Sequence, residues 1–232
     1  MRIDVLTLFP GMFSAVMGES IIKRAIVSKK VLIKIHNIRD YTKNKHKKVD
    51  NKPFGGGCGM VFNLQPIFDA FDNVRKKNKF ADVILLTPQG RPFQQQTAWD
   101  LSRKKGMILI SGHYEGIDER IKPIIDMELS IGDYILTGGE IPAMAVIDAV
   151  IRLLPGVLGH NHSCVDESFN CGLLEYPQYT RPAEYRNLKV PDVLLSGNHK
   201  SIITWRRMQS ILKTIDKRPD LIKHINQLEL GE

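Results

Sequence analysis

Strand-like and helix-like hydrophobic patterns alternate along the chain from Met1 to Gly159. Short apolar runs rich in Val, Ile and Leu predict buried strands. These runs cover Ile3–Phe9, Val31–His36, Val83–Thr87 and Met107–Ser111. Longer segments with apolar positions at helical spacing predict helices over Leu64–Lys77, Phe93–Lys105 and Ile141–Leu154. Such alternation is typical of an α/β fold in which helices cover a mostly parallel sheet.

The pattern changes after residue 160. Residues 161–173 are polar and lack apolar periodicity, which predicts a flexible linker that is mobile without substrate. Residues 174–232 then predict a small helical C-terminal domain, with helices over Ser201–Lys217 and Pro219–Leu228. In the first of these helices, five apolar residues recur at helical spacing and are expected to face a core. They are Ile202, Trp205, Met208, Leu212 and Ile215.

Three glycine-rich segments mark a candidate binding site. Two directly follow predicted strands, at Thr87–Arg91 and Ser111–Arg120, and the third, Ser130–Pro142, leads into a predicted helix. Glycine lets backbone approach a ligand closely, and open α/β sheets bind ligands beyond the carboxyl ends of their strands. Each segment alone is adequately explained as a connection between elements. Three in one domain favour a shared small-molecule pocket, in which Ile135 and Leu136 would wall a flat apolar ligand.

Other ligand motifs fit this sequence less well. The segment Gly55–Met60 lacks the Gly-Lys-Ser/Thr ending of a Walker loop, and Phe9–Met12 stands where a Rossmann fingerprint would be. The carboxylates of Glu115, Asp118 and Glu119 are not accompanied by His or Cys at metal-ligand spacing. We therefore predict no metal site from spacing, and expect surface or interface ion pairs around residues 118–120.

The charge balance points to a polyanionic partner. The chain has 33 Lys and Arg against 25 Asp and Glu, a formal net charge of +8, and such an excess favours contacts to phosphates. One basic cluster surrounds Asp50 and includes Lys47 and Lys48; a second lies in the C-terminal helical part and includes Arg206 and Lys213. A solvated basic face explains either cluster alone, whereas two in one basic chain favour nucleic-acid binding.

The cysteines and the apolar runs of the sequence indicate the cellular compartment in which the protein is expected. The three cysteines form no CxxC pair, which favours free thiols in a reducing cytosol. Arg2 and Asp4 are charged residues that frame the start of a short predicted strand, so this region is not the apolar region of a signal peptide. The longest mostly apolar run, 142–158, is interrupted by two charged residues and a proline, so no membrane span is predicted. We expect a cytoplasmic protein.

Motifs spread in order over nearly the whole chain carry a family resemblance. They are Leu8–Pro10 with Met12–Phe13, Pro53–Met60, Pro88–Arg91, Gly112–Arg120, Ser130–Pro142, Arg152 with Pro155–Gly159, Tyr179–Pro182 and Pro191–His199. Together they resemble the bacterial tRNA (guanosine(37)-N(1))-methyltransferases, a family of the SPOUT class. The resemblance implies that residues 1–160 form a SPOUT catalytic domain with a C-terminal trefoil knot, and that residues 174–232 bind tRNA.

The resemblance also implies an activity: methyl transfer from S-adenosylmethionine to N1 of guanosine 37, beside the anticodon. The enzyme would be a homodimer whose active sites are shared between subunits, with a magnesium requirement that no ligand set in this sequence establishes. The implied cofactor-binding residues lie in or beside the three glycine segments. They are Leu85, Leu86, Pro88, Gly112, Tyr114, Glu115, Gly116, Ile131, Gly132, Asp133, Tyr134, Ile135, Leu136, Gly138 and Gly139.

The chemistry calls for a base and a cation, because guanine N1 carries a proton and negative charge develops toward O6 as that proton leaves. The resemblance assigns the cation to Arg152. The family has an aspartate directly before a Ser-Phe pair, where this chain has Glu167, with Asp166 one place upstream. Glu167 is the predicted base and Asp166 the alternative. The implied RNA-binding residues are Asp50, Lys47, Lys48, Arg206 and Lys213.

Two other functions remain open from the sequence. One is a SPOUT methyltransferase that acts on ribosomal RNA, and the other is a non-catalytic RNA-binding module. The intact Ser130–Pro142 segment and Arg152 favour retained catalysis, whereas the glutamate in place of the family aspartate favours its loss. Incubation with labelled cofactor and bulk tRNA separates the three functions.

Overall fold

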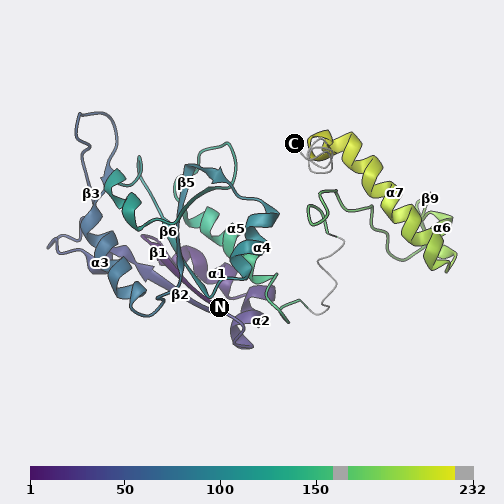
Figure 1. Cartoon of the computed structure of the whole chain (residues 1–232), viewed down its shortest axis with the longest axis horizontal. Helices are drawn as coiled ribbons and strands as arrows, with labels where there is room; N and C mark the ends of the chain where they lie inside the picture. Colours follow the sequence, from purple (N-terminus) through teal and green to yellow (C-terminus); the bar gives the residue numbers. More distant parts are fainter. Residues whose placement is uncertain (159–166, 223–232) are drawn as a thin grey trace. The chain divides into compact units, whose positions relative to one another are not determined.

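The computed structural model describes residues 1–158 and 167–222 of the chain. Residue contacts divide the chain into two units, Met1–His160 and Asn161–Glu232. Figure 1 shows the first unit as a central sheet with helices around it, and the second as a long helix with irregular segments beside it.

The first unit is built on a five-stranded sheet in the order β2-β1-β6-β5-β7. Every neighbouring pair of strands is parallel, which confirms the predicted α/β class and the mostly parallel sheet. Side chains of β1 and β6 are almost completely buried, so these strands form the middle of the core. The strands are β1 (Arg2–Thr7), β2 (Leu32–Asn37), β5 (Asp82–Pro92), β6 (Gly106–Ser111) and β7 (Met127–Ser130).

Helices cover both faces of this sheet. One hydrophobic cluster joins helix α3 to strand residues such as Leu6 and Ile108. Neighbouring strand residues such as Val5 and Leu109 point to the opposite face, and Figure 1 shows α3 and α5 on opposite sides of the sheet. The helices of this unit are α1 (Ser14–Met17), α2 (Ser20–Val27), α3 (Leu64–Arg75), α4 (Gln95–Ser102) and α5 (Glu140–Ile151). Short 3-10 helices are η1 (Pro10–Phe13), η2 (Ile38–Tyr41) and η3 (Glu119–Ile124).

The predicted strands and helices of this unit are confirmed, with ends shifted by a few residues. One prediction needs correction, because β5 continues as a strand through the predicted glycine loop Thr87–Arg91. The register with β7 shifts between Leu86 and Arg91, so the segment is an irregularity inside a strand. Gly90 is required there, because a Cβ would overlap the backbone of Glu128 and Leu129. Helix α2, strand β7 and the small hairpin of β3 (Asp50–Asn51) and β4 (Val61–Phe62) were not predicted from the sequence.

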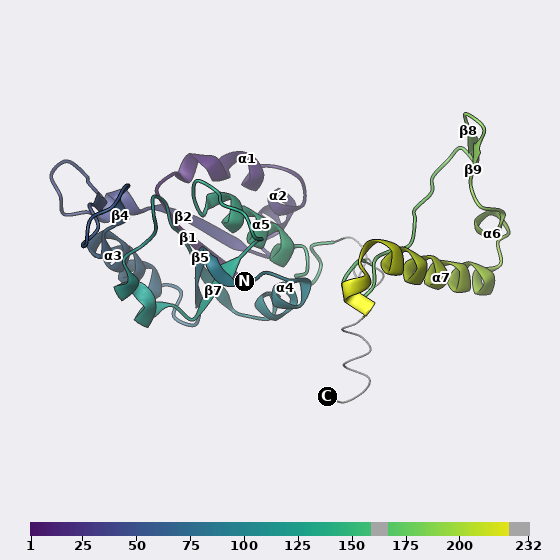
Figure 2. The same cartoon turned by 90° about the horizontal axis from the view of Figure 1, so that it is seen from above.

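The second unit contains one long helix, α7 (His199–Lys217), the short helix α6 (Asp192–Leu195) and a hairpin of β8 (Glu184–Tyr185) and β9 (Leu188–Lys189) (Figure 2). Residues 219–222 are helical, and the rest of the predicted helix Pro219–Leu228 lies outside the described residues. Linker residues 161–166, including Asp166, also lie outside them. In the described residues, no helix is long and apolar enough to cross a membrane.

The packed side of α7 agrees only in part with the predicted one. Ile202 and Trp205 are partly buried, and the ring centres of Trp205 and Tyr179 lie 6.3 Å apart. Met208, Leu212 and Ile215 are all more than half exposed, so the prediction that they face a core is wrong. The packed side includes buried Thr214, whose Oγ1 accepts a hydrogen bond from the backbone N–H of Leu174 at 2.9 Å. The covered side of α7 therefore combines the apolar side chains of Ile202 and Trp205 with the polar contacts of Thr214.

The buried carboxylate of Asp4 stabilises strand β1. Asp4 on β1 has no exposed surface. It accepts hydrogen bonds from Nε of Arg2 at 2.7 Å and Nδ2 of Asn78 at 2.9 Å, and it lies 2.8 Å from Nε2 of His36. Burial alone would raise the pKa of Asp4, but the contacts to His36, Arg2 and Asn78 outweigh burial and lower this pKa to about 2.

This depressed pKa makes the stability of the fold sensitive to acid. The ionised form of Asp4 is favoured in the folded state, so its contribution is fully present above pH 3.8 and is lost as pH falls toward 2. We expect the free energy of unfolding to fall by about 2 kcal/mol over this range through Asp4. Urea unfolding at pH 5 and pH 2 measures it. Asp4→Asn should remove this pH dependence and exposed Asp72→Asn should keep it; an unchanged slope in Asp4→Asn contradicts the assignment.

Candidate active site

The glycine segments meet around one cavity of about 630 Å³ in the first unit. Its walls come from the ends of β5 and β6, from the loop after β6 and from residues 130–139 after β7. The volume lies in the range typical of small-molecule sites. Every predicted cofactor-binding residue lines this cavity except Asp133, which is exposed and is not part of the lining. The structure thus brings these residues together, while their ligand stays a prediction.

Glycines allow close backbone contact between the loop after β6 and residues 131–139 after β7. The backbone N–H of Gly139 donates a hydrogen bond to the carbonyl of Gly112 at 2.8 Å, and Gly138 forms an antiparallel bridge with His113. A Cβ on Gly139 would lie 2.7 Å from Cα of Ser111, closer than real Cβ atoms approach. A Cβ on Gly138 would overlap the side chains of His113 and Glu140. The absence of side chains at 138 and 139 therefore permits this junction.

Exposed apolar groups surround the opening of the cavity. Ile135 is 80% exposed, and Tyr134 and Tyr114 are 54% and 41% exposed. Tyr114 also adopts a positive φ of 65°, an uncommon conformation for a residue with a side chain. Large apolar groups left in water at the rim of a cavity mark a place where a ligand can cover them. These residues suit the flat apolar ligand expected from the sequence.

Sequence reasoning did not single out a buried carboxylate below the cavity. Glu140, at the first position of α5, is 1% exposed, and its Oε1 accepts a hydrogen bond from the hydroxyl of Thr7 at 2.7 Å. Its Oε2 lies 3.2 Å from Nε2 of His113, an ion-pair distance without hydrogen-bond geometry. The ring of His113 packs against Phe9 with centroids 4.7 Å apart. The contacts of Glu140 therefore join β1, α5 and the cavity wall.

Glu140→Ala tests this structural role. The change removes the acceptor for Thr7 and leaves a void in the core, so we expect the free energy of unfolding to fall by about 2–3 kcal/mol. Exposed Asp100→Ala, which loses a surface ion pair to Arg103, should cost about 0–1 kcal/mol. Urea denaturation of both variants provides the comparison. Equal losses in the two variants would show that Glu140 does not hold these elements together.

The acidic segment after the cavity loop forms surface ion pairs, as predicted. Arg120 donates two side-chain hydrogen bonds to Asp118, at 2.9 Å and 2.6 Å, and its presence lowers the pKa of Asp118 to about 2. Glu119 pairs with Lys122 one turn later. Among residues 1–158 and 167–222, no three His, Cys, Asp or Glu side chains gather as a metal site. The magnesium requirement therefore stays a prediction.

The predicted catalytic residues belong to different units of the chain, and Arg152 is not among the residues that line the cavity. Arg152 follows the last residue of α5, whereas the first turn of α5 lines the cavity. Pro142 of this first turn lines the cavity, and Arg152 is ten residues later, about 15 Å further along the helix. Glu167 belongs to the second unit, where its carbonyl accepts a hydrogen bond from the N–H of Asn170 at 3.3 Å. The roles of Arg152 and Glu167 stay predictions, and Asp166 lies outside the described residues.

The predicted RNA-binding residues occupy two different settings. Lys47 and Lys48 are exposed on the loop that leads to Asp50, and Asp50 pairs with Phe62 in the small hairpin. In the second unit, Arg206 and Lys213 contact their own chain. The guanidinium of Arg206 lies 4.8 Å from the ring centre of Tyr176, and Nζ of Lys213 donates to the carbonyl of Glu175 at 3.0 Å. The helical face that was expected to bind RNA is thus partly used for packing within the second unit, and its role in RNA binding stays a prediction.

Comparison with known proteins identifies the family. A family model described as tRNA (Guanine-1)-methyltransferase TrmD matches residues 1–224. A curated tRNA (guanine-N(1)-)-methyltransferase of Geobacillus kaustophilus is 56% identical over 96% of this chain and 91% of that protein. One of the same name from Caldanaerobacter subterraneus is 54% identical over 99% of this chain and 95% of that protein. The chain therefore belongs to the tRNA (guanine-1)-methyltransferase family, TrmD.

Proposed function

We propose that this protein transfers a methyl group from S-adenosylmethionine to N1 of guanosine 37 in tRNA. The observation that carries the proposal is the cavity at the carboxyl ends of β5 and β6, where glycine backbone replaces side chains, in a chain of this family. The second part of the proposal, a polyanionic substrate, is supported by the net charge of +8 and by the exposed lysines around Asp50.

The cavity offers groups that match each part of the cofactor. Tyr134, Ile135 and Leu136 supply apolar surface for the adenine ring, and backbone groups of Gly112 and Gly138 supply hydrogen bonds at its edge. When bound, S-adenosylmethionine supplies an activated methyl group on a sulfonium. The contribution of the protein is alignment, because holding two reactants in the reactive geometry supplies much of the rate acceleration of such a displacement.

Two side chains complete the proposed chemistry. Glu167 accepts the proton from guanine N1, which makes that nitrogen a nucleophile. Arg152 donates hydrogen bonds toward guanine O6, where negative charge develops as the proton leaves. Asp166 is the alternative base.

The length of α5 supports a shared active site. Arg152 lies about 15 Å along the helix from Pro142, the α5 residue that lines the cavity. We therefore propose a homodimer in which Arg152 and the linker 161–173 of one copy serve the cavity of the other. In this arrangement residues 1–160 form the catalytic domain and residues 174–232 bind tRNA in the cytoplasm.

The path of residues 131–139 supports a knotted sheet. The chain leaves β7 at the edge of the sheet and returns to β6, where Gly139 is hydrogen bonded to Gly112, before α5 begins. The return crosses the end of β5, which lies between β6 and β7. We propose that this crossing is part of the trefoil knot implied by the resemblance.

Methyl transfer from labelled S-adenosylmethionine tests the proposed function. The purified protein is incubated separately with bulk bacterial tRNA and with ribosomal RNA, and the labelled nucleoside is identified after digestion. The proposal predicts 1-methylguanosine in tRNA alone. Label in ribosomal RNA alone would favour the ribosomal RNA methyltransferase, and tight RNA binding without any transfer would favour the non-catalytic module.

A further inference from the structure

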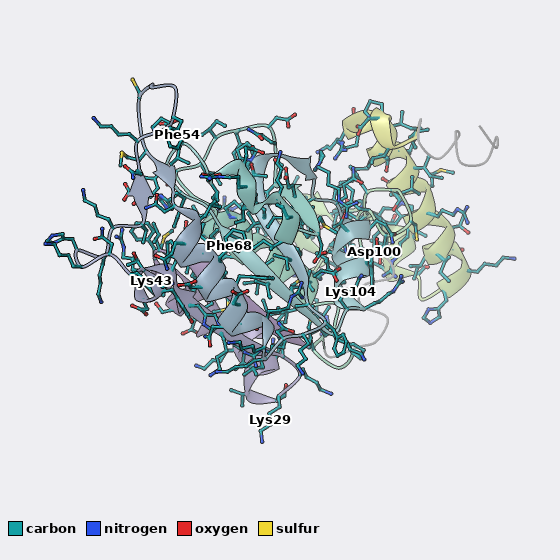
Figure 3. All side chains as sticks on the ribbon, turned by 60° about the vertical axis from the view of Figure 1, so that its left-hand side comes forward. Lys29, Lys43, Phe54, Phe68, Asp100 and Lys104 are labelled. Carbon is teal, nitrogen blue, oxygen red and sulfur yellow. The ribbon has the colours of Figure 1, made fainter. Side chains whose placement is uncertain are left out.

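Phe54 is the most exposed large hydrophobic residue described in the chain. Its side chain is 99% exposed, whereas Phe13, Phe62 and Phe71 are 1%, 0% and 8% exposed. It lies in the loop that connects β3 to β4, and Figure 3 shows this loop projecting from the body of the first unit. A phenylalanine left in water forgoes about 1.5–3 kcal/mol of burial free energy. Such a position suggests that the ring is covered by a binding partner.

The backbone beside Phe54 is built of glycines that packing does not require. Gly55, Gly56 and Gly57 have positive φ values of 86°, 78° and 117°. A Cβ at any of these three positions would meet no heavy atom within 4 Å. The glycines therefore serve the conformation of an open loop, and they leave room for another molecule to approach the backbone beside the ring.

The segment of chain that precedes Phe54 is basic. Lys52 lies two residues before it and is exposed, and the preceding loop carries further exposed lysines at 43, 45, 47 and 48. An exposed aromatic ring in a lysine-rich setting is the arrangement with which proteins hold single-stranded nucleic acid, where bases stack on the ring and cations track the phosphates.

The loop is also connected to the cavity by hydrogen bonds. The carbonyl of Met60 accepts from the N–H of Glu115 at 3.1 Å, and the N–H of Phe62 donates to the carbonyl of Gly116 at 3.0 Å. Both Glu115 and Gly116 line the cavity. Six residues separate Phe54 from Met60, so the ring lies within about 20 Å of this wall even for an extended chain. That reach corresponds to only a few nucleotides.

We propose that Phe54 stacks on an unpaired base of the RNA substrate and thereby positions the target nucleotide at the cavity. The inference rests on the proposed function and adds to it a positioning residue outside the cofactor cavity. We specify an unpaired base because only a base that has left its helix presents a free face on which the Phe54 ring can stack.

Steady-state kinetics with bulk tRNA test the inference. Phe54→Ala should raise KM for tRNA about tenfold, the size expected for loss of one base–aromatic contact. The value of kcat should change less than twofold, and the affinity for S-adenosylmethionine should not change. Phe54→Tyr and Phe54→Trp should restore KM because both keep a flat ring, while Phe54→Leu should not. A wild-type KM for tRNA in Phe54→Ala, with normal methyl transfer, overturns the inference.

A second readout does not depend on catalysis. In Phe54→Trp, stacking on a base should quench the added indole fluorescence when bulk tRNA is titrated. Phe80→Trp is the matched control, because Phe80 is 74% exposed and also has a lysine, Lys105, over its ring at 5.3 Å. It lies before β5, at the opposite end of the strands from the cavity. Equal quenching in both variants contradicts the inference, whereas failure of the proposed function appears separately, as absence of methyl transfer by the wild type.

Discussion

Gly139→Ala is expected to weaken binding of S-adenosylmethionine by about 10- to 100-fold, the cost of forcing extra atoms into a packed junction. The new Cβ would lie 2.7 Å from Cα of Ser111 and 3.0 Å from the backbone nitrogen of Gly112. These are backbone atoms of β6 and its loop, so the strain cannot be relieved by turning a side chain. The loop 130–139 must move away from the loop after β6, which opens the cavity. Isothermal titration calorimetry measures the change.

Gly11→Ala provides the matched control for this experiment. Gly11 lies in η1, and a Cβ there would meet no heavy atom within 4 Å. We expect its affinity for S-adenosylmethionine to equal that of the wild type. Circular dichroism shows whether each variant remains folded. Wild-type affinity in a folded Gly139→Ala protein would show that the junction of the two loops does not form the cofactor site.

Glu167→Gln is expected to reduce methyl transfer by about 100- to 10,000-fold, the contribution of a positioned general base. Glutamine has the same shape but cannot accept the proton from guanine N1. The affinity for S-adenosylmethionine should remain unchanged, because the cavity residues lie in the first unit and Glu167 in the second. Single-turnover assays with labelled cofactor and saturating tRNA measure the chemical step.

Glu175 provides the control for this prediction, and Asp166 tests the alternative base. Glu175→Gln should keep normal activity, since the Glu175 carboxylate accepts a hydrogen bond from Gln178. Asp166→Asn should have a smaller effect than Glu167→Gln. Near-normal turnover in Glu167→Gln together with loss of turnover in Asp166→Asn would transfer the role of base to Asp166.

Much of the first unit could be predicted from its hydrophobic pattern. The buried strands β1 and β6 and the helices α3 and α5 were expected, because burial on both faces produces continuous apolar runs and helical packing produces regular spacing. Strand β7 was missed because it is short and Glu128 interrupts its apolar residues. The hairpin of β3 and β4 was missed because two-residue strands leave no periodic pattern.

The parts of the site that depend on close backbone approach could be predicted from the sequence. The parts that depend on contacts between residues far apart in the chain could not. Gly112, Gly138 and Gly139 were expected at the cavity because close backbone approach excludes side chains. The contact between Glu140 and Thr7 joins residues far apart in the sequence, so no local pattern indicates it. In the second unit, apolar spacing indicated the partly buried Ile202 and Trp205 but not the exposed Met208, because Lys213 and Thr214 also make polar contacts to the segment before α7 on the packed side.

A crystal structure of the protein soaked with S-adenosylmethionine tests the central claim most directly. We expect density for one adenosyl group per chain between residues 131–136 and the loop after β6, with its methyl group directed to the open side of the cavity. Density at another place, or an empty cavity at a cofactor concentration that supports methyl transfer, would contradict the account.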